Sequence, residues 1–154
     1  MSSSNKTEGR AARTPCPEEI AFLDLARTTE ALSGPVSQLL KSEDLSPAQY
    51  NILRILRGSP DGLTCTEAGE RMITRDSDIT RLLDRLEKRK LIGRNRDEKD
   101  RRVVLTKITR EGLELLAGLD QPVRNLHRKL LGHLGPERLR TLTALLEACR
   151  REVS

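Results

Sequence analysis

The chain has 154 residues, enough for one domain with a hydrophobic core, and it is 36% hydrophobic and 33% charged. No apolar run approaches the roughly 20 residues that a membrane-spanning helix needs, and the first residues lack the apolar core of a signal peptide, so we expect a cytoplasmic protein. Three cysteines without a close-spaced pair, and only two histidines, argue against a disulfide framework and a structural zinc site.

The net charge of +5 is concentrated in one segment. Residues 75–102 hold eleven basic and seven acidic side chains, a local net charge of +4. Such a patch favours contacts with phosphate and the release of counterions from a nucleic acid. An ion-paired, solvated surface would show the same excess, so the charge alone leaves both interpretations open.

The N-terminal part of the sequence predicts a tail followed by a helix. Residues 1–16 are polar and cannot bury enough surface to fold, which predicts a flexible tail. A helix is expected within residues 17–45, because Glu18 and Glu19 suit its positive N-terminal end and apolar residues recur at helical spacing. Pro35 can kink this helix.

Two short helices are expected next. Ser46 followed by Pro47 is a typical helix start, and that helix should end at Gly58. Thr64 with Glu67 three residues later fits a capping box at the start of the second.

The following predicted helix, residues 76–90, has an apolar and a polar face. Asp76 or Ser77 is expected to cap it. The side chains expected to face the core are Ile79, Leu82, Leu83 and Leu86. The side chains on the opposite face are Ser77, Asp78, Thr80, Arg81, Asp84 and Arg85. Two short helices joined by a tight connection, the second with an arginine-bearing outer face, predict a helix-turn-helix.

A basic β-hairpin is expected directly after this helix. Leu91 and Ile92 open one strand and residues 103–108 form the other, with the polar stretch RNRDEKDRR between them. A helix followed by a basic hairpin is the layout of a winged helix. The helix can reach base edges in the major groove of DNA, and the hairpin tip can reach the adjacent minor groove.

Leucine-rich helices are expected in residues 111–154. Thr109 should cap the first, Pro122 should bend or interrupt it, and a sharp turn at residues 135–137 should precede the last. The outer helices carry broad apolar faces, which predicts a symmetric dimer because such faces aggregate when exposed. The alternative is that these helices pack on the chain's own core.

The sequence resembles the MarR family of bacterial winged-helix transcription regulators from about Glu18 onward. The stretches that carry the resemblance are ITRLLDRLEKRKLIGR, DEKDRR and LTKITREG. The resemblance implies a mainly α fold with a small β-wing. Residues 46–110 would form the winged helix-turn-helix domain, and residues 17–45 and 111–154 the dimerisation helices. It also implies a homodimer that binds a palindromic operator in double-stranded DNA, most simply as a repressor that blocks polymerase.

By the same resemblance, the wing motif falls on Asp100, Arg101 and Arg102. Arg102 is expected to reach the minor groove, whose negative potential attracts a guanidinium, and Asp100 to hold it in place. The expected DNA contacts are Arg75, Ser77, Thr80, Arg81, Arg85, Arg101 and Arg102.

Several of these roles have alternatives. Arg81 can bond a guanine edge or a phosphate. Arg85 can instead pair with Asp84 or Glu87. Asp78 would repel phosphate, so it is expected to act as a cap or to select against certain sequences.

The sequence departs from the family pattern at two positions. Lys90 stands where the family usually has glycine after the recognition helix, so the turn into the strand can differ, because lysine is strained in a left-handed conformation. Gly69 replaces a helix former, which either lets two helices approach closely or weakens the helix.

The resemblance implies two kinds of effector. Many relatives release DNA when a small aromatic acid or phenol binds, and others sense oxidants through a cysteine near the first helix. Cys16 lies close to that place, although the tyrosines that usually accompany such a cysteine are missing, since the only tyrosine is Tyr50. With Phe22 as the only other aromatic residue, a ligand pocket would be lined mostly by aliphatic side chains. No cofactor is expected.

Other classes of protein find less support. The sequence has no glycine-rich phosphate loop, no nucleophile elbow and no coherent set of Ser, His and Asp, so we expect no enzyme. The remaining alternative is a helical interaction module whose basic hairpin binds an acidic protein or RNA.

Overall fold

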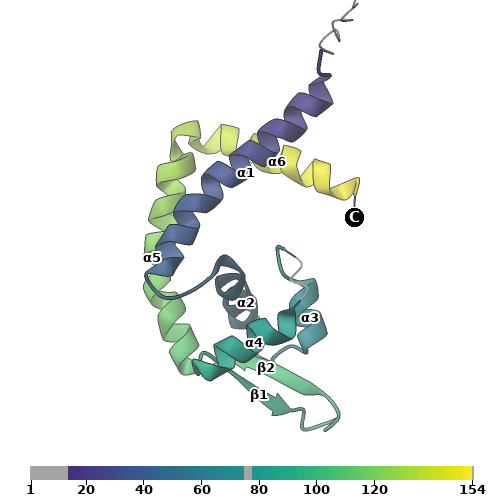
Figure 1. Cartoon of the computed structure of the whole chain (residues 1–154), viewed down its shortest axis with the longest axis vertical. Helices are drawn as coiled ribbons and strands as arrows, with labels where there is room; N and C mark the ends of the chain where they lie inside the picture. The colour runs from purple at the N-terminus through teal and green to yellow at the C-terminus, as the bar shows by residue number, and fades with distance from the viewer. Residues whose placement is uncertain (1–13, 75–77, 154) are drawn as a thin grey trace, which may run out of the picture. The chain divides into compact units, whose positions relative to one another are not determined.

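The computed structural model describes residues 14–74 and 78–153. The chain divides into two compact units, Met1–Ser33 and Gly34–Ser154. The elements in chain order are α1 (Pro17–Lys41), α2 (Pro47–Arg57), α3 (Cys65–Glu70), α4 (Ile79–Lys88), β1 (Ile92–Arg96), β2 (Val104–Ile108), α5 (Arg110–Leu131), the 3-10 turn η1 (Gly132–Leu134) and α6 (Gly135–Arg151) (Figure 1). Helices dominate and the two strands form one antiparallel sheet, which confirms the expected fold class, mainly α with a small β-wing.

Side-chain caps fix the starts of the helices that carry the wing. The hydroxyl of Ser46 accepts a hydrogen bond from the Gln49 N–H, and the Gln49 side chain accepts one from the Ser46 N–H, which closes a capping box. Thr64 and Glu67 form the predicted second box. Thr109 caps α5, also as predicted. These local signals are the reason why the sequence placed these three starts correctly.

The start of α4 differs from the prediction. Asp78 is the N-cap, because its carboxylate accepts a hydrogen bond from the Arg81 N–H. The helix is therefore shorter than the expected helix over residues 76–90, and the expected caps Asp76 and Ser77 lie outside the described residues. The role of Asp78 as a cap is confirmed.

The core of the second unit is aliphatic. Leu82, Leu83 and Leu86 of α4 are buried, as their spacing predicted. The side chains elsewhere in the unit that are less than 2% exposed include Leu40, Ile52, Leu53, Leu56 and Leu116. Each such side chain stabilises the fold by about 1.5–3 kcal/mol relative to an exposed one.

The hairpin is longer than predicted and has an additional partner. β1 and β2 pair from Ile92 with Ile108 to Arg96 with Val104, so β1 extends into the stretch expected to be turn. Leu63, just before α3, forms an isolated bridge to β2. The Leu63 N–H donates to the Thr106 carbonyl at 3.0 Å, and the Thr106 N–H donates to the Leu63 carbonyl at 2.7 Å. Backbone pairing explains the extra length, because it does not depend on side-chain polarity.

A tight turn connects α4 to β1. The Lys90 N–H donates to the Glu87 carbonyl and the Leu91 N–H to the Leu86 carbonyl, the paired bonds of a Schellman motif. Lys90 has φ of 59°, so the left-handed turn is kept although lysine replaces the family's glycine. This conformation costs a non-glycine residue about 1–2 kcal/mol.

The start of α5 lies against this turn. The Thr109 N–H donates to the Leu91 carbonyl at 3.0 Å, and the Thr109 hydroxyl to the Lys90 carbonyl at 2.7 Å. A β-carbon on Gly112 would overlap the Leu91 carbonyl oxygen and lie 2.7 Å from Ile108 Cγ1. Only glycine lets the helix approach this closely.

Proline does not end the long helices. Pro35 lies inside α1 and Pro122 inside α5, so the predicted interruption at Pro122 is wrong. The lost backbone bond is tolerated because Leu119 and Val123 on either side are buried in the core. The turn expected at residues 135–137 lies earlier, in η1, and α6 begins at Gly135. No helix among the described residues is both long and apolar enough to cross a membrane.

Two glycine-to-alanine substitutions should act in opposite directions. Gly112→Ala should lower the free energy of unfolding by roughly 3 kcal/mol, because a backbone oxygen cannot move aside. Gly69→Ala should raise it by roughly 0.5–1 kcal/mol, because alanine favours a helix. A β-carbon on Gly69 would meet Ile79 at 3.8 Å, an ordinary contact, so the close helix approach considered for Gly69 is wrong. Denaturant unfolding measures both values, and equal losses would contradict this packing argument.

Candidate nucleic-acid interface

α4 presents a polar face to solvent opposite its buried leucines. Thr80, Arg81 and Arg85 are exposed on this face, while Arg75 and Ser77 lie outside the described residues. Arg81 Nε lies 3.3 Å from a carboxylate oxygen of Asp78, and both side chains remain more than half exposed. An ion pair this exposed contributes little, so a phosphate or base can replace the aspartate.

The acidic residues of α4 turn toward the hairpin. Arg94 Nη2 of β1 lies 2.6 Å from Asp84 Oδ1, and Arg94 Nε lies 3.7 Å from Glu87 Oε2. Within the described part of the chain Arg85 pairs with neither acid, so the alternative that Arg85 is held by Asp84 or Glu87 is wrong. The Arg85 side chain is exposed.

Arg94 is the residue that sequence reasoning missed. Its side chain is only 24% exposed, and its Nε is buried without a hydrogen-bond partner among the described residues. It projects from β1 and holds α4, so it joins the hairpin to the helix. Its partner Asp84 precedes it by ten residues in a different element, and no local pattern in the sequence indicates that pairing.

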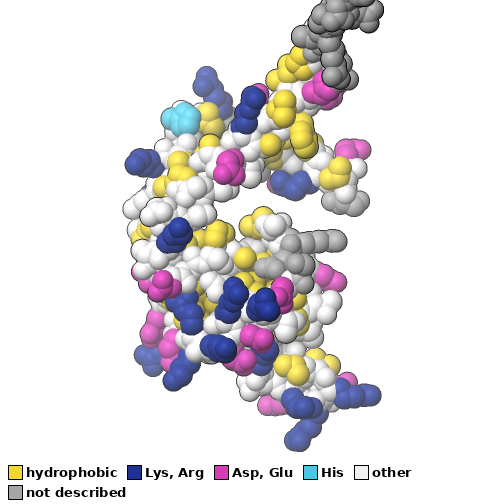
Figure 2. Space-filling model, in the orientation of Figure 1, with side chains coloured by type: hydrophobic (Ala, Val, Ile, Leu, Met, Phe, Trp, Pro, Cys, Tyr) yellow, Lys and Arg dark blue, Asp and Glu magenta, His cyan; other side chains and the backbone are white. Residues whose placement is uncertain are grey.

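The hairpin tip holds the predicted wing motif in an ordered turn. Asp100 Oδ1 accepts hydrogen bonds from the Arg102 N–H at 3.0 Å and from Arg102 Nε at 3.2 Å, while the Arg102 side chain stays 92% exposed. Arg96 Nη1 donates to the Arg101 carbonyl at 2.9 Å. Figure 2 shows Lys and Arg side chains gathered at this tip. The tip is therefore cationic, and hydrogen bonds from its own side chains hold its backbone in place.

Other basic residues of the segment serve the fold. Arg89 donates to the carbonyls of Asp44 and Glu43 at 2.7 and 3.0 Å, which ties the end of α4 to the turn after α1. Arg89, Arg94 and Arg96 thus each bond to a carbonyl or carboxylate of the protein itself. The other described cations of this segment, all exposed, are Arg81, Arg85, Lys88, Lys90, Lys99, Arg101 and Arg102.

Cys16 lies among carboxylates in the first unit. Its N–H donates to Glu19 Oε2 at 3.0 Å. The pKa of Glu18 is lowered by a backbone hydrogen bond and then by one from the Cys16 side chain. Reactive thiolates are stabilised by neighbouring cations, whereas the neighbours here are anions. The surroundings of Cys16 therefore give no support to the oxidant sensor considered from the sequence.

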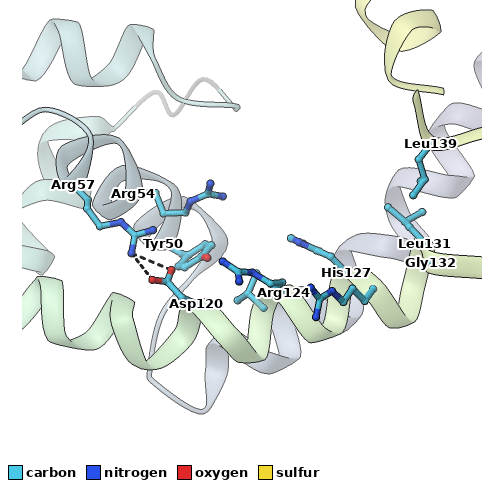
Figure 3. Close-up of a pocket in the computed structure, with 11 residues that line it drawn as sticks. Tyr50, Arg54, Arg57, Asp120, Arg124, His127, Leu131, Gly132 and Leu139 are labelled. Carbon is cyan, nitrogen blue, oxygen red and sulfur yellow. Dashed lines mark hydrogen bonds and ion pairs between the residues drawn. The ribbon is translucent and has the colours of Figure 1, made fainter. Parts of the chain in front are cut away.

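A cleft of about 480 Å³ is lined by residues of α2, α5, η1 and α6 (Figure 3). Arg57 Nη1 of α2 donates to both carboxylate oxygens of Asp120 of α5, at 3.0 and 2.8 Å. This bond lowers the pKa of Asp120 and raises that of Arg57, and the charges of Arg124 and Arg54 lower the Asp120 pKa further. The cleft thus contains one satisfied ion pair and additional arginines.

Known proteins similar to this chain are transcription regulators. The model described as MarR family matches residues 43–103. The chain is 31% identical over 141 residues to the uncharacterized HTH-type transcriptional regulator YfiV of Bacillus subtilis (strain 168), with 87% of each chain covered. It is 33% identical over 100 residues to the HTH-type transcriptional repressor MdtR of the same organism, a match that spans 62% of this chain and 64% of that protein. The crystal structure of a MarR transcription factor from Planctomyces limnophilus aligns with a TM-score of 0.67 and 37% identity, covering 88% of this chain and 99% of that one.

The link between Arg94 and Asp84 can be tested by its effect on binding to duplex DNA. Asp84→Asn removes a negative charge next to the expected DNA surface, which by charge alone should strengthen binding. If the link positions α4 against the hairpin, Asp84→Asn should instead weaken binding by roughly threefold to fivefold. Fluorescence anisotropy with a duplex selected from random sequence measures this. The matched control is Glu98→Gln, an exposed acid at the hairpin tip, which should strengthen binding; strengthening by both would exclude a positioning role.

Proposed function

The chain belongs to the MarR family of transcriptional regulators, and from this premise we propose that it represses transcription by binding a palindromic operator as a homodimer. The proposal is carried by the arrangement of an exposed, arginine-bearing α4 beside a hairpin whose tip holds Arg102 on Asp100. In each protomer α4 would read base edges in the major groove and the hairpin would enter the next minor groove. The two α4 helices would occupy half-sites about one helical turn apart.

The proposed roles follow from the exposure and the hydrogen bonds of each side chain. Arg102, fixed at its backbone and exposed at its guanidinium, enters the minor groove. Arg81 would contact either a base edge or a phosphate. Arg94 would hold α4 against the hairpin and would not itself contact DNA. The proposed DNA contacts are Arg75, Ser77, Thr80, Arg81, Arg85, Arg101 and Arg102, of which Arg75 and Ser77 rest on the family resemblance alone.

The homodimer is proposed from apolar side chains that each unit leaves exposed. In the first unit, Phe22 of α1 is 72% exposed and Leu23 is 49% exposed. In the second, α6 has no buried residue among those described, and its Leu145 is 61% exposed. Apolar surface of this kind is normally covered by a partner. Residues 17–45 and 111–154 are therefore proposed as dimerisation helices and residues 46–110 as the DNA-binding domain.

The proposed regulation is release from DNA when a small molecule binds in the cleft that contains Arg57 and Asp120. Relatives of this chain are transcriptional regulators, and no catalytic role is proposed. A protein that binds chromosomal DNA in a bacterium acts in the cytoplasm, which is the proposed location.

Removing the wing arginine should weaken binding to some sites more than to others. Arg102→Ala is expected to cost roughly 1–3 kcal/mol on operators whose flanks are A·T-rich, because a narrow minor groove attracts the guanidinium most strongly. Anisotropy titrations on A·T- and G·C-flanked duplexes measure the difference. Arg138→Ala on α6, an equal loss of charge away from the hairpin, should leave both affinities unchanged. An equal loss on both duplexes for Arg102→Ala would remove minor-groove readout from the mechanism.

The decisive test of the whole proposal is binding to the DNA upstream of the protein's own gene. Titrations over a salt series, with random duplex as competitor, should show tight binding that resists the competitor. Footprinting should show two half-sites roughly 10 base pairs apart. Weak binding that any duplex abolishes equally would instead favour a module whose basic hairpin binds an acidic protein or RNA.

A further inference from the structure

The cleft between α2 and α5 is strongly cationic. Its lining includes Arg54 and Arg57 from α2 and Arg124 and Arg128 from α5, whereas Asp120 is the only acidic residue in it. With His127 neutral, these groups give the cleft a net charge of +3. Four guanidinium groups around one carboxylate leave most of that positive charge without a counter-charge inside the site.

Only one of these arginines is paired by the protein. Both oxygens of Asp120 accept from Arg57. Within the described residues, Arg124 and Arg128 have no ion pair, and Arg54 lies over the Tyr50 ring, 5.8 Å from its centroid. The charges of Arg124 and Arg54 both contribute to lowering the pKa of Asp120, so both arginines lie in the neighbourhood of that carboxylate. Figure 3 shows the side chains of Arg54 and Arg124 extending from the two helices into the cleft.

The cleft offers little to an aromatic ring. Tyr50 is the only Phe, Tyr or Trp residue that lines it; it is 8% exposed and Arg54 lies over its ring. The guanidinium groups are therefore more accessible to a ligand than the face of the tyrosine ring. Guanidinium groups bind carboxylate and phosphate through paired hydrogen bonds.

From this lining we propose that the cleft is a site for a compact anion with two or more negative charges, a polycarboxylate or a phosphate ester, rather than for an aromatic acid. One anionic group binds Arg54 and Arg124, and a second competes with Asp120 for Arg57. This proposal rests on the proposed function, in which the cleft holds the effector, and it names the chemical class of that effector.

The Arg57–Asp120 bond gives the anion a route to the DNA-binding elements. Asp120 is on the same helix as Gly112, which packs against the turn between α4 and β1. An anion that draws Arg57 away from Asp120 removes the two hydrogen bonds from Arg57 Nη1 that join α2 to α5. The anion is therefore expected to weaken operator binding.

The site is tested first without DNA, by calorimetric titration of the full chain with citrate, pyrophosphate and benzoate at constant ionic strength. We expect citrate or pyrophosphate to bind. Tighter binding of citrate would indicate a polycarboxylate effector, and tighter binding of pyrophosphate a phosphate ester. Arg124→Gln should weaken this binding by roughly tenfold, the equivalent of one charge-assisted hydrogen bond. Asp120→Asn should strengthen it, because it removes the competing carboxylate.

Arg140→Gln is the matched control, because it removes an equal charge from α6 outside the cleft and should leave anion binding unchanged. Thermal unfolding of each variant checks that it is folded. No binding of either polyanion, tighter binding of benzoate, or equal weakening by Arg124→Gln and Arg140→Gln would overturn the proposed site.

The regulation is then tested by adding the polyanion found to bind in the calorimetric titration to a complex of the protein with its operator. We expect a loss of operator affinity that Arg124→Gln suppresses, and unchanged affinity would overturn the coupling. Failure of the protein to bind any operator would contradict the proposed function, whereas the calorimetric result on the anion site would be unaffected by it.

Discussion

The contact of α5 with the Leu91 carbonyl is the constraint on which the position of the wing depends. At this point the left-handed turn at Lys90 ends α4, β1 begins, and Thr109 bonds back to both Lys90 and Leu91. Because Gly112 has no side chain, α5 approaches the turn until backbone meets backbone. The end of α4, the start of β1 and the start of α5 are thus fixed relative to one another by a few backbone and hydroxyl hydrogen bonds. Arg94 adds a second connection further along the hairpin.

The sequence predicted those parts of the fold that depend on neighbouring residues. Capping at Ser46, Thr64 and Thr109, and burial of the α4 leucines, follow from spacings of three and four residues. It missed the bridge at Leu63 and the pairing of Arg94, because each joins residues of different elements. Their partners become neighbours only after the chain has folded.

The sequence predicted that the interface is positively charged, but not which basic side chains are bonded to the protein and which are exposed. Counting basic residues treats Arg89, Arg94 and Arg96 like the rest, yet each donates to a carbonyl or carboxylate of the protein itself. These bonds hold the three guanidinium groups against the protein, so they are less free to turn toward DNA than those of Arg85 and Arg101. The cations that remain lie on or just after α4 and at the hairpin tip, two surfaces joined by the partly buried Arg94. The hydrogen bonds and ion pairs within the domain therefore determine which basic side chains remain available at its surface.

α5 packs against the turn between α4 and β1 at Gly112 and lines the cleft at Asp120. Gly112 and Asp120 are eight residues apart, which is roughly 12 Å along a helix. A helix can transmit a small rotation over that distance because most of the intervening peptides are hydrogen-bonded; the Gly118 carbonyl is the exception, since Pro122 has no N–H. Near Gly112 the packing has no free space, so a rotation of α5 cannot be absorbed by side chains and must move the turn at Leu91. The close packing that fixes the wing is thus also what would make the wing respond when the Arg57–Asp120 bond is broken.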